Sequence, residues 1–207
     1  MTKNGDIIEL APVELLRRHD PDLRLTRYFE ILKAENQKIN LVSRETIDSG
    51  LEILAAESLL PFDQIERQPF RNYLDIGSGG GLPAFPILLT KPIEKATLVE
   101  RVSKKSLALG RIVRGLYMDS TSVEIVEGNF EELSFEGQFD LVTLRLVALT
   151  KRVLKKIDSV LASSGIFIYY AAASDLETPK SMSCVTYCYK TSVDAPTKSF
   201  TICRKIV

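Results

Sequence analysis

The sequence predicts an α/β fold with a mostly parallel sheet, an antiparallel pair of strands at the C-terminal edge and a helical extension at the N-terminus. From residue 72 onward, short apolar runs alternate with segments of helical periodicity, which is typical of strand–helix–strand units in a parallel sheet. A glycine-rich segment follows the first of these runs. Residues 1 to 70 show helical spacing of their apolar residues instead.

The N-terminal segment is expected to form helices. Asp20-Pro21 is the pattern of an N-cap followed by proline at the first helical position. Four apolar residues then recur at helical spacing: Leu25, Tyr28, Phe29 and Leu32. A further helix is expected over 46–60. We therefore expect an N-terminal helical cap over residues 1–70 and a second domain over 71–207.

The second domain is expected to alternate strands and helices. Strands are predicted over 72–77, 95–100, 122–126, 139–144 and 166–172. Helices are predicted over 82–90, 103–117 and 149–162. After Asp175 the pattern becomes alternating and β-rich, and segments 183–191 and 199–206 are expected to pair antiparallel at the sheet edge.

Composition limits the class of protein. A chain of 207 residues with 45% hydrophobic content suits one α/β domain with an extension. No stretch approaches the ~20 apolar residues of a membrane span, and no signal peptide is visible, so we expect a cytoplasmic protein without a membrane partner. Cys184, Cys188 and Cys203 are odd in number and lack metal-ligand partners nearby, so we expect buried free thiols and no metal site.

Charge is balanced overall but uneven along the chain. There are 27 basic and 27 acidic residues, which lowers the expectation of nucleic-acid binding. Segments 101–118 and 141–157, however, hold basic residues and no acidic one. A one-sided basic surface fits a polyanion partner, and solvated helix faces would give the same pattern. Charge alone leaves both interpretations open.

The segment 73–83, Tyr-Leu-Asp-Ile-Gly-Ser-Gly-Gly-Gly-Leu-Pro, predicts a strand, a tight turn and a helix start. Glycines there permit positive φ and let a ligand approach the main chain. Asp75, at the end of the strand, is expected to face whatever the loop holds. The pattern indicates a nucleotide- or nucleoside-cofactor site with Asp75, Gly77, Gly79 and Gly81 as binding residues.

Two cofactors are compatible with this loop. Gly79-x-Gly81-x-x-Ala84 satisfies the dinucleotide fingerprint of NAD-dependent dehydrogenases. Asp75 favours S-adenosylmethionine, because a carboxylate suits a cationic amino-acid end better than a pyrophosphate. Glu100, at the end of the next strand, suits ribose hydroxyls in either fold, and an exposed strand-end glutamate is its plain alternative.

A series of motifs extends along nearly the whole chain. In order they are Asn-Leu-x-Ser at 40–43, Glu-Ser-Leu at 57–59, Asp-Ile-Gly-Ser-Gly-Gly-Gly-Leu-Pro at 75–83, Leu-Val-Glu-Arg at 98–101 with Ser-Lys-Lys at 103–105, Phe-Glu-Glu at 130–132, Phe-Asp-Leu-Val-Thr at 139–143, Arg-x-Val-Ala at 145–148 and Ile-x-Arg-Lys-Ile at 202–206. The chain thereby resembles the small-subunit ribosomal RNA guanine-N7 methyltransferases, the glucose-inhibited division protein B family.

The resemblance implies a Rossmann-like class I methyltransferase fold that binds S-adenosylmethionine. Gly77 and Leu82 would line the methionine and adenosine pocket, and Glu100 would take the ribose. Phe130 and Glu131 would flank the adenine. Without the resemblance, Phe130 would be assigned to the core and Glu131 to a solvated helix.

The resemblance also implies a reaction and a partner. Arg145 would face the cofactor or the incoming guanine and is the candidate catalytic residue. The implied reaction is methylation of guanine N7 in small-subunit (16S) ribosomal RNA, either naked or in a ribosomal particle. Separately, we expect a monomer. Four basic residues are candidates for holding RNA phosphates: Lys104, Lys105, Arg111 and Arg114.

Guanine N7 offers a lone pair and no proton, so no general base is needed, and His19 is expected to be a surface or capping residue.

Several positions depart from the family's usual residues: Ile53, Leu54 and Glu57 stand where Arg, His and Asp are typical, and Ala171 stands where Lys is typical. Two alternatives therefore stay open. One is a methyltransferase acting on another RNA or a small molecule, and the other is a non-catalytic RNA- or ribosome-binding protein that keeps the cofactor pocket.

Overall fold

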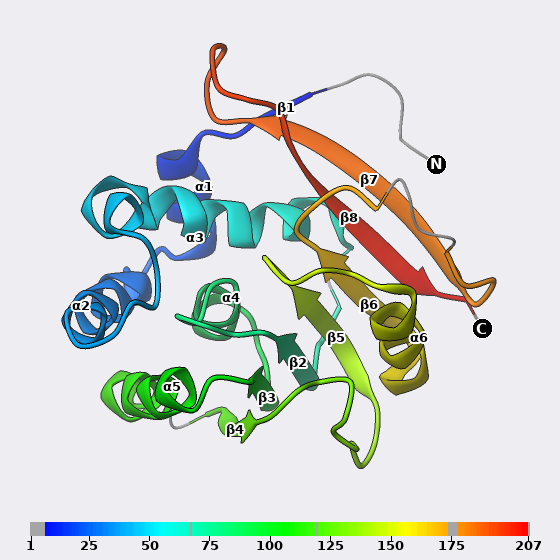
Figure 1. Cartoon of the computed structure of the whole chain (residues 1–207). Helices are drawn as coiled ribbons and strands as arrows, with labels where there is room; N and C mark the ends of the chain where they lie inside the picture. Colours follow the sequence, from blue (N-terminus) through cyan, green and yellow to red (C-terminus); the bar gives the residue numbers. More distant parts are fainter. Residues whose placement is uncertain (1–6, 67, 119, 174–177, 207) are drawn as a thin grey trace.

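The computed structural model describes residues 7–66, 68–118, 120–173 and 178–206, and within them one eight-stranded sheet runs through the molecule (Figure 1). The strand order is β1-β7-β8-β6-β5-β2-β3-β4. The strands are β1 (Ile8–Glu9), β2 (Asn72–Ile76), β3 (Lys95–Glu100), β4 (Ser122–Glu127), β5 (Phe139–Leu144), β6 (Leu161–Tyr169), β7 (Met182–Lys190) and β8 (Lys198–Lys205).

The pairing confirms a mostly parallel sheet with an antiparallel C-terminal edge. Strands β4, β3, β2, β5 and β6 are parallel neighbours, and β8 runs antiparallel to both β6 and β7. The sequence did not predict β1, whose two residues pair parallel with β7, Ile8 opposite Tyr189. The outermost strand on this side therefore comes from the beginning of the chain.

Helices cover the two faces of the sheet unequally. In Figure 1, α1 to α5 lie on one side of the sheet and α6 on the other. The helical segments are α1 (Pro12–His19), α2 (Arg24–Asn36), a π-helical turn (Thr46–Gly50), α3 (Leu51–Leu59), a 3-10 turn (Leu60–Gln64), α4 (Ala84–Thr90), α5 (Ser103–Leu116) and α6 (Lys151–Val160).

Alternation along the central strands divides the core into two clusters. Tyr73 and Leu141 face the larger one, which contains α1 to α5, whereas Leu74, Ile76 and Val142 face the smaller one beneath α6. This is the period of two that places successive strand residues on opposite faces. The larger cluster includes residues on both sides of position 70, and the domain boundary there stays a prediction.

The start of α2 differs from the expected cap. The helix begins at Arg24, and Leu23 occupies the cap position with a left-handed backbone. Pro21 is therefore not at the first helical position. Asp20 still serves the helix, because its two carboxylate oxygens accept hydrogen bonds from the backbone N–H groups of Arg24 (2.8 Å) and Leu25 (2.9 Å).

The C-terminal part of the chain differs from the sequence prediction in two respects. Strand β6 begins at Leu161 instead of residue 166, with an irregular register opposite Phe139 and Leu141. Cys184 and Cys203 are opposite each other on β7 and β8 and form a disulfide, contrary to the expectation of buried free thiols. The sequence missed this pair because only the register of the two strands brings the residues together. Cys188 is a free thiol, but it is partly exposed.

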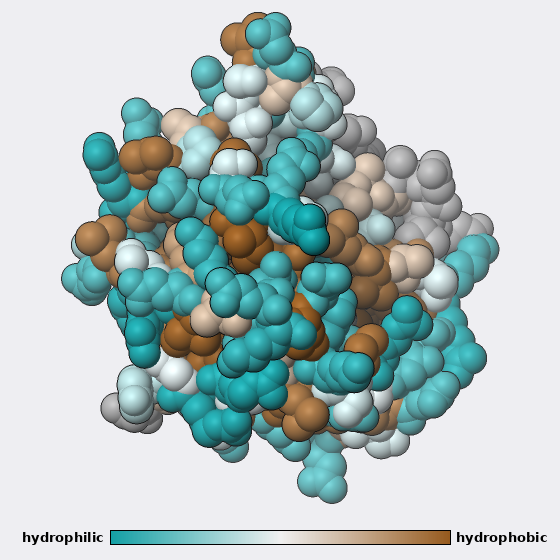
Figure 2. All heavy atoms as spheres, turned by 60° about the vertical axis from the view of Figure 1, so that its left-hand side comes forward, coloured by the Kyte–Doolittle hydropathy of each residue, from teal (hydrophilic) through white to brown (hydrophobic). Residues whose placement is uncertain are grey.

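The surface over the N-terminal helices is mainly hydrophilic. In Figure 2, hydrophobic residues on this face form small groups among hydrophilic ones. In the part of the chain that the structure describes, no helix combines the length and apolar character needed to cross a bilayer.

The Asp20 cap gives a test of the N-terminal packing. We expect Asp20→Ala to lower the free energy of unfolding by about 1–2 kcal/mol, because two helix N–H groups lose their acceptor at a position that is only 5% exposed. Urea denaturation measures this, with the exposed neighbour Asp22→Ala as the control. Equal losses in the two variants would contradict the capping role.

Candidate functional site

The glycine loop joins the end of β2 to α4. Its entry is fixed by Val99, whose carbonyl oxygen accepts hydrogen bonds from the N–H groups of Gly77 (2.8 Å) and Ser78 (3.0 Å). Glycine is required at residue 77, where φ is +75° and a Cβ atom would lie 2.4 Å from Cγ2 of Val147. It is also required at residue 81, where φ is +89° and a Cβ atom would lie 2.0 Å from the Phe85 ring.

A cavity of about 830 Å³ opens over this loop. Its walls come from the glycine loop, from the segments after β3, β4 and β5, and from the N-terminal segment at Leu41, Val42, Thr46 and Leu54. Strand β2 lies between β3 and β5. From β3 the chain continues outward to β4 on one side of β2, and from β5 it continues outward to β6 on the other side. The cavity thus lies at the carboxyl ends of the strands where the strand order reverses, the usual ligand position in open α/β sheets.

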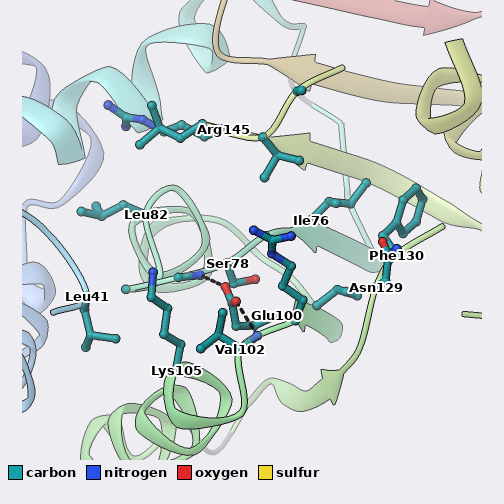
Figure 3. A pocket seen from close by; sticks show the side chains of 18 of the residues that line it. Leu41, Ile76, Ser78, Leu82, Glu100, Val102, Lys105, Asn129, Phe130 and Arg145 are labelled. Atoms are coloured by element: carbon teal, nitrogen blue, oxygen red, sulfur yellow. Dashed lines mark hydrogen bonds between the residues drawn. The ribbon is translucent and has the colours of Figure 1, made fainter. Parts of the chain in front are cut away.

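Glu100 is buried at the floor of the cavity, and both of its oxygens have partners. One accepts a hydrogen bond from Gly79 N–H and the other from Val102 N–H, each at 2.9 Å (Figure 3). The carboxylate therefore ties the glycine loop to the start of α5. Each oxygen keeps a further lone pair that a hydroxyl group of a ligand can use.

Asp75 does not line the cavity, contrary to our expectation that it faces the contents of the loop. It is 1% exposed and lies behind the loop, where Oδ1 accepts a hydrogen bond of 2.5 Å from the Thr143 hydroxyl. Its Oδ2 is buried without a partner among the described residues. Burial raises the pKa of Asp75 to about 6; repulsion by Glu100 adds to this, and hydrogen bonds to the carboxylate oppose it.

The predicted cofactor residues of the glycine loop also divide into those that line the cavity and one that lies behind it. Gly77, Gly79 and Leu82 line the cavity. Gly81 does not, because it packs against Phe85 beneath the loop. Gly79 is the open position, since a Cβ atom there would meet nothing closer than the Gly77 oxygen at 3.8 Å.

Phe130 and Glu131 both line the cavity, in the segment after β4. Phe130 is also a core residue, 4% exposed, with its ring centre 5.7 Å from that of Phe135. Glu131 forms an ion pair with Arg152 of α6 at 3.3 Å. Phe130 therefore combines its expected place in the cavity wall with the core role considered as its alternative, whereas Glu131 lies in a turn and is partly buried, not on a solvated helix.

Arg145 also lines the cavity, but its guanidinium points to α3 (Figure 3). It donates hydrogen bonds to the Leu54 carbonyl (3.2 Å), to Ser58 Oγ (3.3 Å) and to Glu57 Oε2 (2.6 Å). It also lies over the Tyr170 ring, 5.6 Å from its centre. The side chain thus anchors the segment after β5 to the N-terminal helices.

Glu57 accepts a second cation in this cluster. Its carboxylate is 1% exposed and also pairs with Lys198 of β8 at 2.7 Å. Two of the positions that depart from the family pattern, Leu54 and Glu57, are therefore direct partners of Arg145.

The four predicted phosphate-binding residues of α5 are not equivalent. Lys105 lines the cavity and points toward it (Figure 3). Lys104 and Arg114 are exposed. Arg111 pairs with Glu35 of α2 at 2.7 Å and so holds the two helices together.

Several cavity residues were not among the sequence candidates: Ser78, Arg101, Asn129, Leu146 and Lys198. Arg101 could have been found in the basic stretch that begins with it. Lys198 gave no local signal, because its position depends on β8 lying beside β6.

His19 lies outside the cavity lining; it is the partly buried last residue of α1, and the cap of that helix is Asp20. Its Nε2 lies 2.9 Å from Asp63 Oδ1, and its Nδ1 lies 2.5 Å from Lys91 Nζ. Burial, with repulsion by Lys91, lowers the pKa of His19. The residue therefore belongs to the contact between α1 and the end of α4.

The raised pKa of Asp75 predicts a pH-dependent stability. Folding favours the protonated carboxyl group. Its stabilising contribution to the free energy of unfolding is therefore complete below the ordinary pKa of 3.8 and is lost as pH rises through about 6. That shift corresponds to roughly 3 kcal/mol. We expect Asp75→Asn to be more stable than wild type above pH ~6, by an amount that shrinks toward pH ~4. Urea denaturation across this range measures it; parallel curves for the two proteins would contradict the raised pKa.

Comparison with known proteins identifies the family. The family model described as rRNA small subunit methyltransferase G matches residues 23–202. A ribosomal RNA small subunit methyltransferase G from Helicobacter acinonychis (strain Sheeba) is 36% identical over 146 residues, which is 70% of this chain and 79% of that protein. One from Helicobacter hepaticus is 31% identical over 173 residues, 80% of this chain and 91% of that protein.

Solved structures share the fold at low sequence identity. A putative O-methyltransferase from Klebsiella pneumoniae superposes with a TM-score of 0.63 at 14% identity, covering 96% of this chain and 97% of that one. An O-methyltransferase from Bacillus cereus, solved in complex with SAH, gives 0.62 at 12% identity, covering 87% and 90%. Since the family model spans most of the chain, the protein belongs to the rRNA small subunit methyltransferase G family.

Proposed function

We propose that this protein transfers a methyl group from S-adenosylmethionine to guanine N7 in small-subunit ribosomal RNA. The observation that carries the proposal is the cavity itself: in a member of this family, a glycine loop, a buried glutamate and the Arg145 segment enclose one space at the switch point of the sheet. Family membership favours this reaction over the dehydrogenase interpretation of the same loop.

The residues present fit S-adenosylmethionine. Gly79 leaves open space where a side chain would stand, and Glu100 offers lone pairs suited to ribose hydroxyls. Asp75 Oδ2 is a buried acceptor without a partner among the described residues, directly behind the loop. We assign the methionine and adenosine wall to Gly77 and Leu82.

The adenine side of the cavity is assigned to Phe130 and Glu131. Phe130 offers an apolar ring fixed by Phe135, and Glu131 offers a carboxylate held by Arg152. Asp75 and Gly81 do not line the cavity, and we assign them indirect roles. Asp75 contributes its charge, and Gly81 lets the chain pack against Phe85 at the start of α4.

The chemistry needs orientation more than proton transfer. When bound, S-adenosylmethionine would supply a methyl group on a sulfonium; guanine N7 would bond to the methyl carbon with its own lone pair as the carbon–sulfur bond breaks, leaving S-adenosylhomocysteine. The protein's part is to hold the reactants in line and to exclude water, and orientation of this kind is worth up to ~7–11 kcal/mol in model reactions. Arg145 is our candidate for contact with the cofactor or the guanine, with its direction set by Glu57.

Basic residues at the cavity support an RNA substrate. Arg101 and Lys105 line it, and Lys104 and Arg114 are exposed on the same helix region. Such side chains position phosphates without reading sequence. Arg111 contributes charge but is held by Glu35. A ribosomal RNA substrate also supports a cytoplasmic location, and we propose that the protein acts as a monomer.

The reaction is tested with labelled S-adenosylmethionine and small ribosomal subunits, or their naked RNA, from cells that lack this protein. We expect label to appear as 7-methylguanosine, with the better substrate showing whether particle or RNA is recognised. Subunits from cells that contain the protein are the control and should accept little label. Cofactor binding without any transfer would contradict the proposal and favour a non-catalytic relative or another substrate.

Glu100 provides a test of the cofactor site. We expect Glu100→Gln to weaken binding of S-adenosylhomocysteine by about 1–2 kcal/mol, because the neutral amide accepts fewer and weaker hydrogen bonds from ribose and from the loop. Titration calorimetry measures this. Glu94→Gln, at a side chain 69% exposed and outside the cavity, is the matched control. Equal affinity of the two folded variants would remove Glu100 from the ribose site.

A further inference from the structure

Leu146 is the most exposed large hydrophobic residue described, and it lies on the wall of the cavity. The residue is 98% exposed. Its backbone has φ of +57°, a left-handed conformation that bulky side chains rarely adopt. An apolar side chain held in water on a strained backbone needs a reason, and such strain concentrates at functional sites.

The other non-glycine residues with a left-handed backbone lie at helix ends or inside a strand, and none of them lines the cavity. Leu23 precedes α2, and Tyr117 follows the last residue of α5, where this conformation commonly ends a helix. Ser164 lies inside β6 beside Gly165. Leu146 is in none of these settings, because it follows β5 and lies well before Thr150, the cap of α6.

The residues before and after Leu146 in the chain are held in place, and they determine where its side chain points. Arg145 is anchored to α3 by three hydrogen bonds. Val147 packs so closely on Gly77 that a Cβ atom at residue 77 would overlap it. Leu149 is buried in the core under α6. The chain between two anchored residues therefore holds the Leu146 side chain outward.

The surroundings of Leu146 combine apolar surface with positive charge. Arg101 and Lys105 line the same cavity as Leu146 and supply positive charge there, whereas Lys198 is paired with Glu57. The carboxylates in the lining already have partners, Glu100 in two backbone N–H groups and Glu131 in Arg152. A partner that suits both the apolar surface and the positive charge must carry negative charge and an apolar flat face. An unpaired RNA nucleotide has this combination, since its phosphate is anionic and its base presents an apolar ring face.

We propose that Leu146 is a substrate-contacting residue, whose side chain packs on the face of the RNA base that enters the cavity. This rests on the proposed function, because it requires an RNA substrate. Packing on a ring face does not distinguish one base from another. Leu146 therefore supplies binding and orientation of the splayed-out base, and identity must be read by other groups.

The test compares two substitutions at Leu146 with one at a matched leucine. Leu146→Asn keeps a residue that tolerates a left-handed backbone but removes the apolar surface, whereas Leu146→Met retains an apolar side chain. Leu23→Asn is the control, since Leu23 is also left-handed (φ +55°), is 68% exposed and does not line the cavity. For each protein, initial rates of methyl transfer are measured against RNA concentration, and S-adenosylhomocysteine affinity by calorimetry.

We expect Leu146→Asn to raise the KM for RNA by about tenfold, the effect of losing most of one apolar contact, with kcat within about twofold of wild type. The affinity of Leu146→Asn for S-adenosylhomocysteine should stay unchanged. Leu146→Met and Leu23→Asn should both keep the KM for RNA of wild type. An unchanged KM in Leu146→Asn, or a parallel loss of S-adenosylhomocysteine affinity, would overturn the inference. If wild type itself transfers no methyl group to RNA, the proposed function fails and this assignment fails with it.

Discussion

The carboxylate of Glu57 is almost completely withdrawn from water, and the arrangement around the cavity depends on how its charge is balanced. A buried carboxylate is tolerated only when cations and hydrogen bonds replace the lost hydration. Here Arg145 and Lys198 supply this from two different parts of the sheet. One charged group thus joins α3, the end of β5 and the start of β8. The N-terminal helices, the cavity wall and the antiparallel edge of the sheet are held in a common frame.

The central fold could be predicted from the sequence because its signals are local. The strand–helix alternation placed β3 and β5 at the residues that the structure shows, and the glycine loop marked the turn into α4. Strand β1 could not be predicted, because Ile8–Glu9 is extended only through its pairing with β7. The Cys184–Cys203 disulfide was missed for a related reason, since strand register brings the two residues together.

The candidate site was predicted in outline, and its failures have a geometric cause. The position of residues along the chain identified Gly77, Gly79 and Glu100 at or just after the ends of adjacent strands, and the family resemblance added Leu82; all four line the cavity. Position along the chain did not give the direction of Asp75, which lies opposite Thr143 in the parallel pair with β5 and bonds to it beneath the loop. Arg145 lines the cavity, but its guanidinium points to α3, and its partners there are distant in sequence and gave no signal.

The pairing of β1 with β7 sets an order for the assembly of the chain. Ile8 is opposite Tyr189 and Glu9 is opposite Lys190, so this edge of the sheet can form only after β7 has been synthesised. Contacts between distant parts of a chain form slowly, because a long loop must close first. Strand β1 is thus expected to be among the last parts of the sheet to pair.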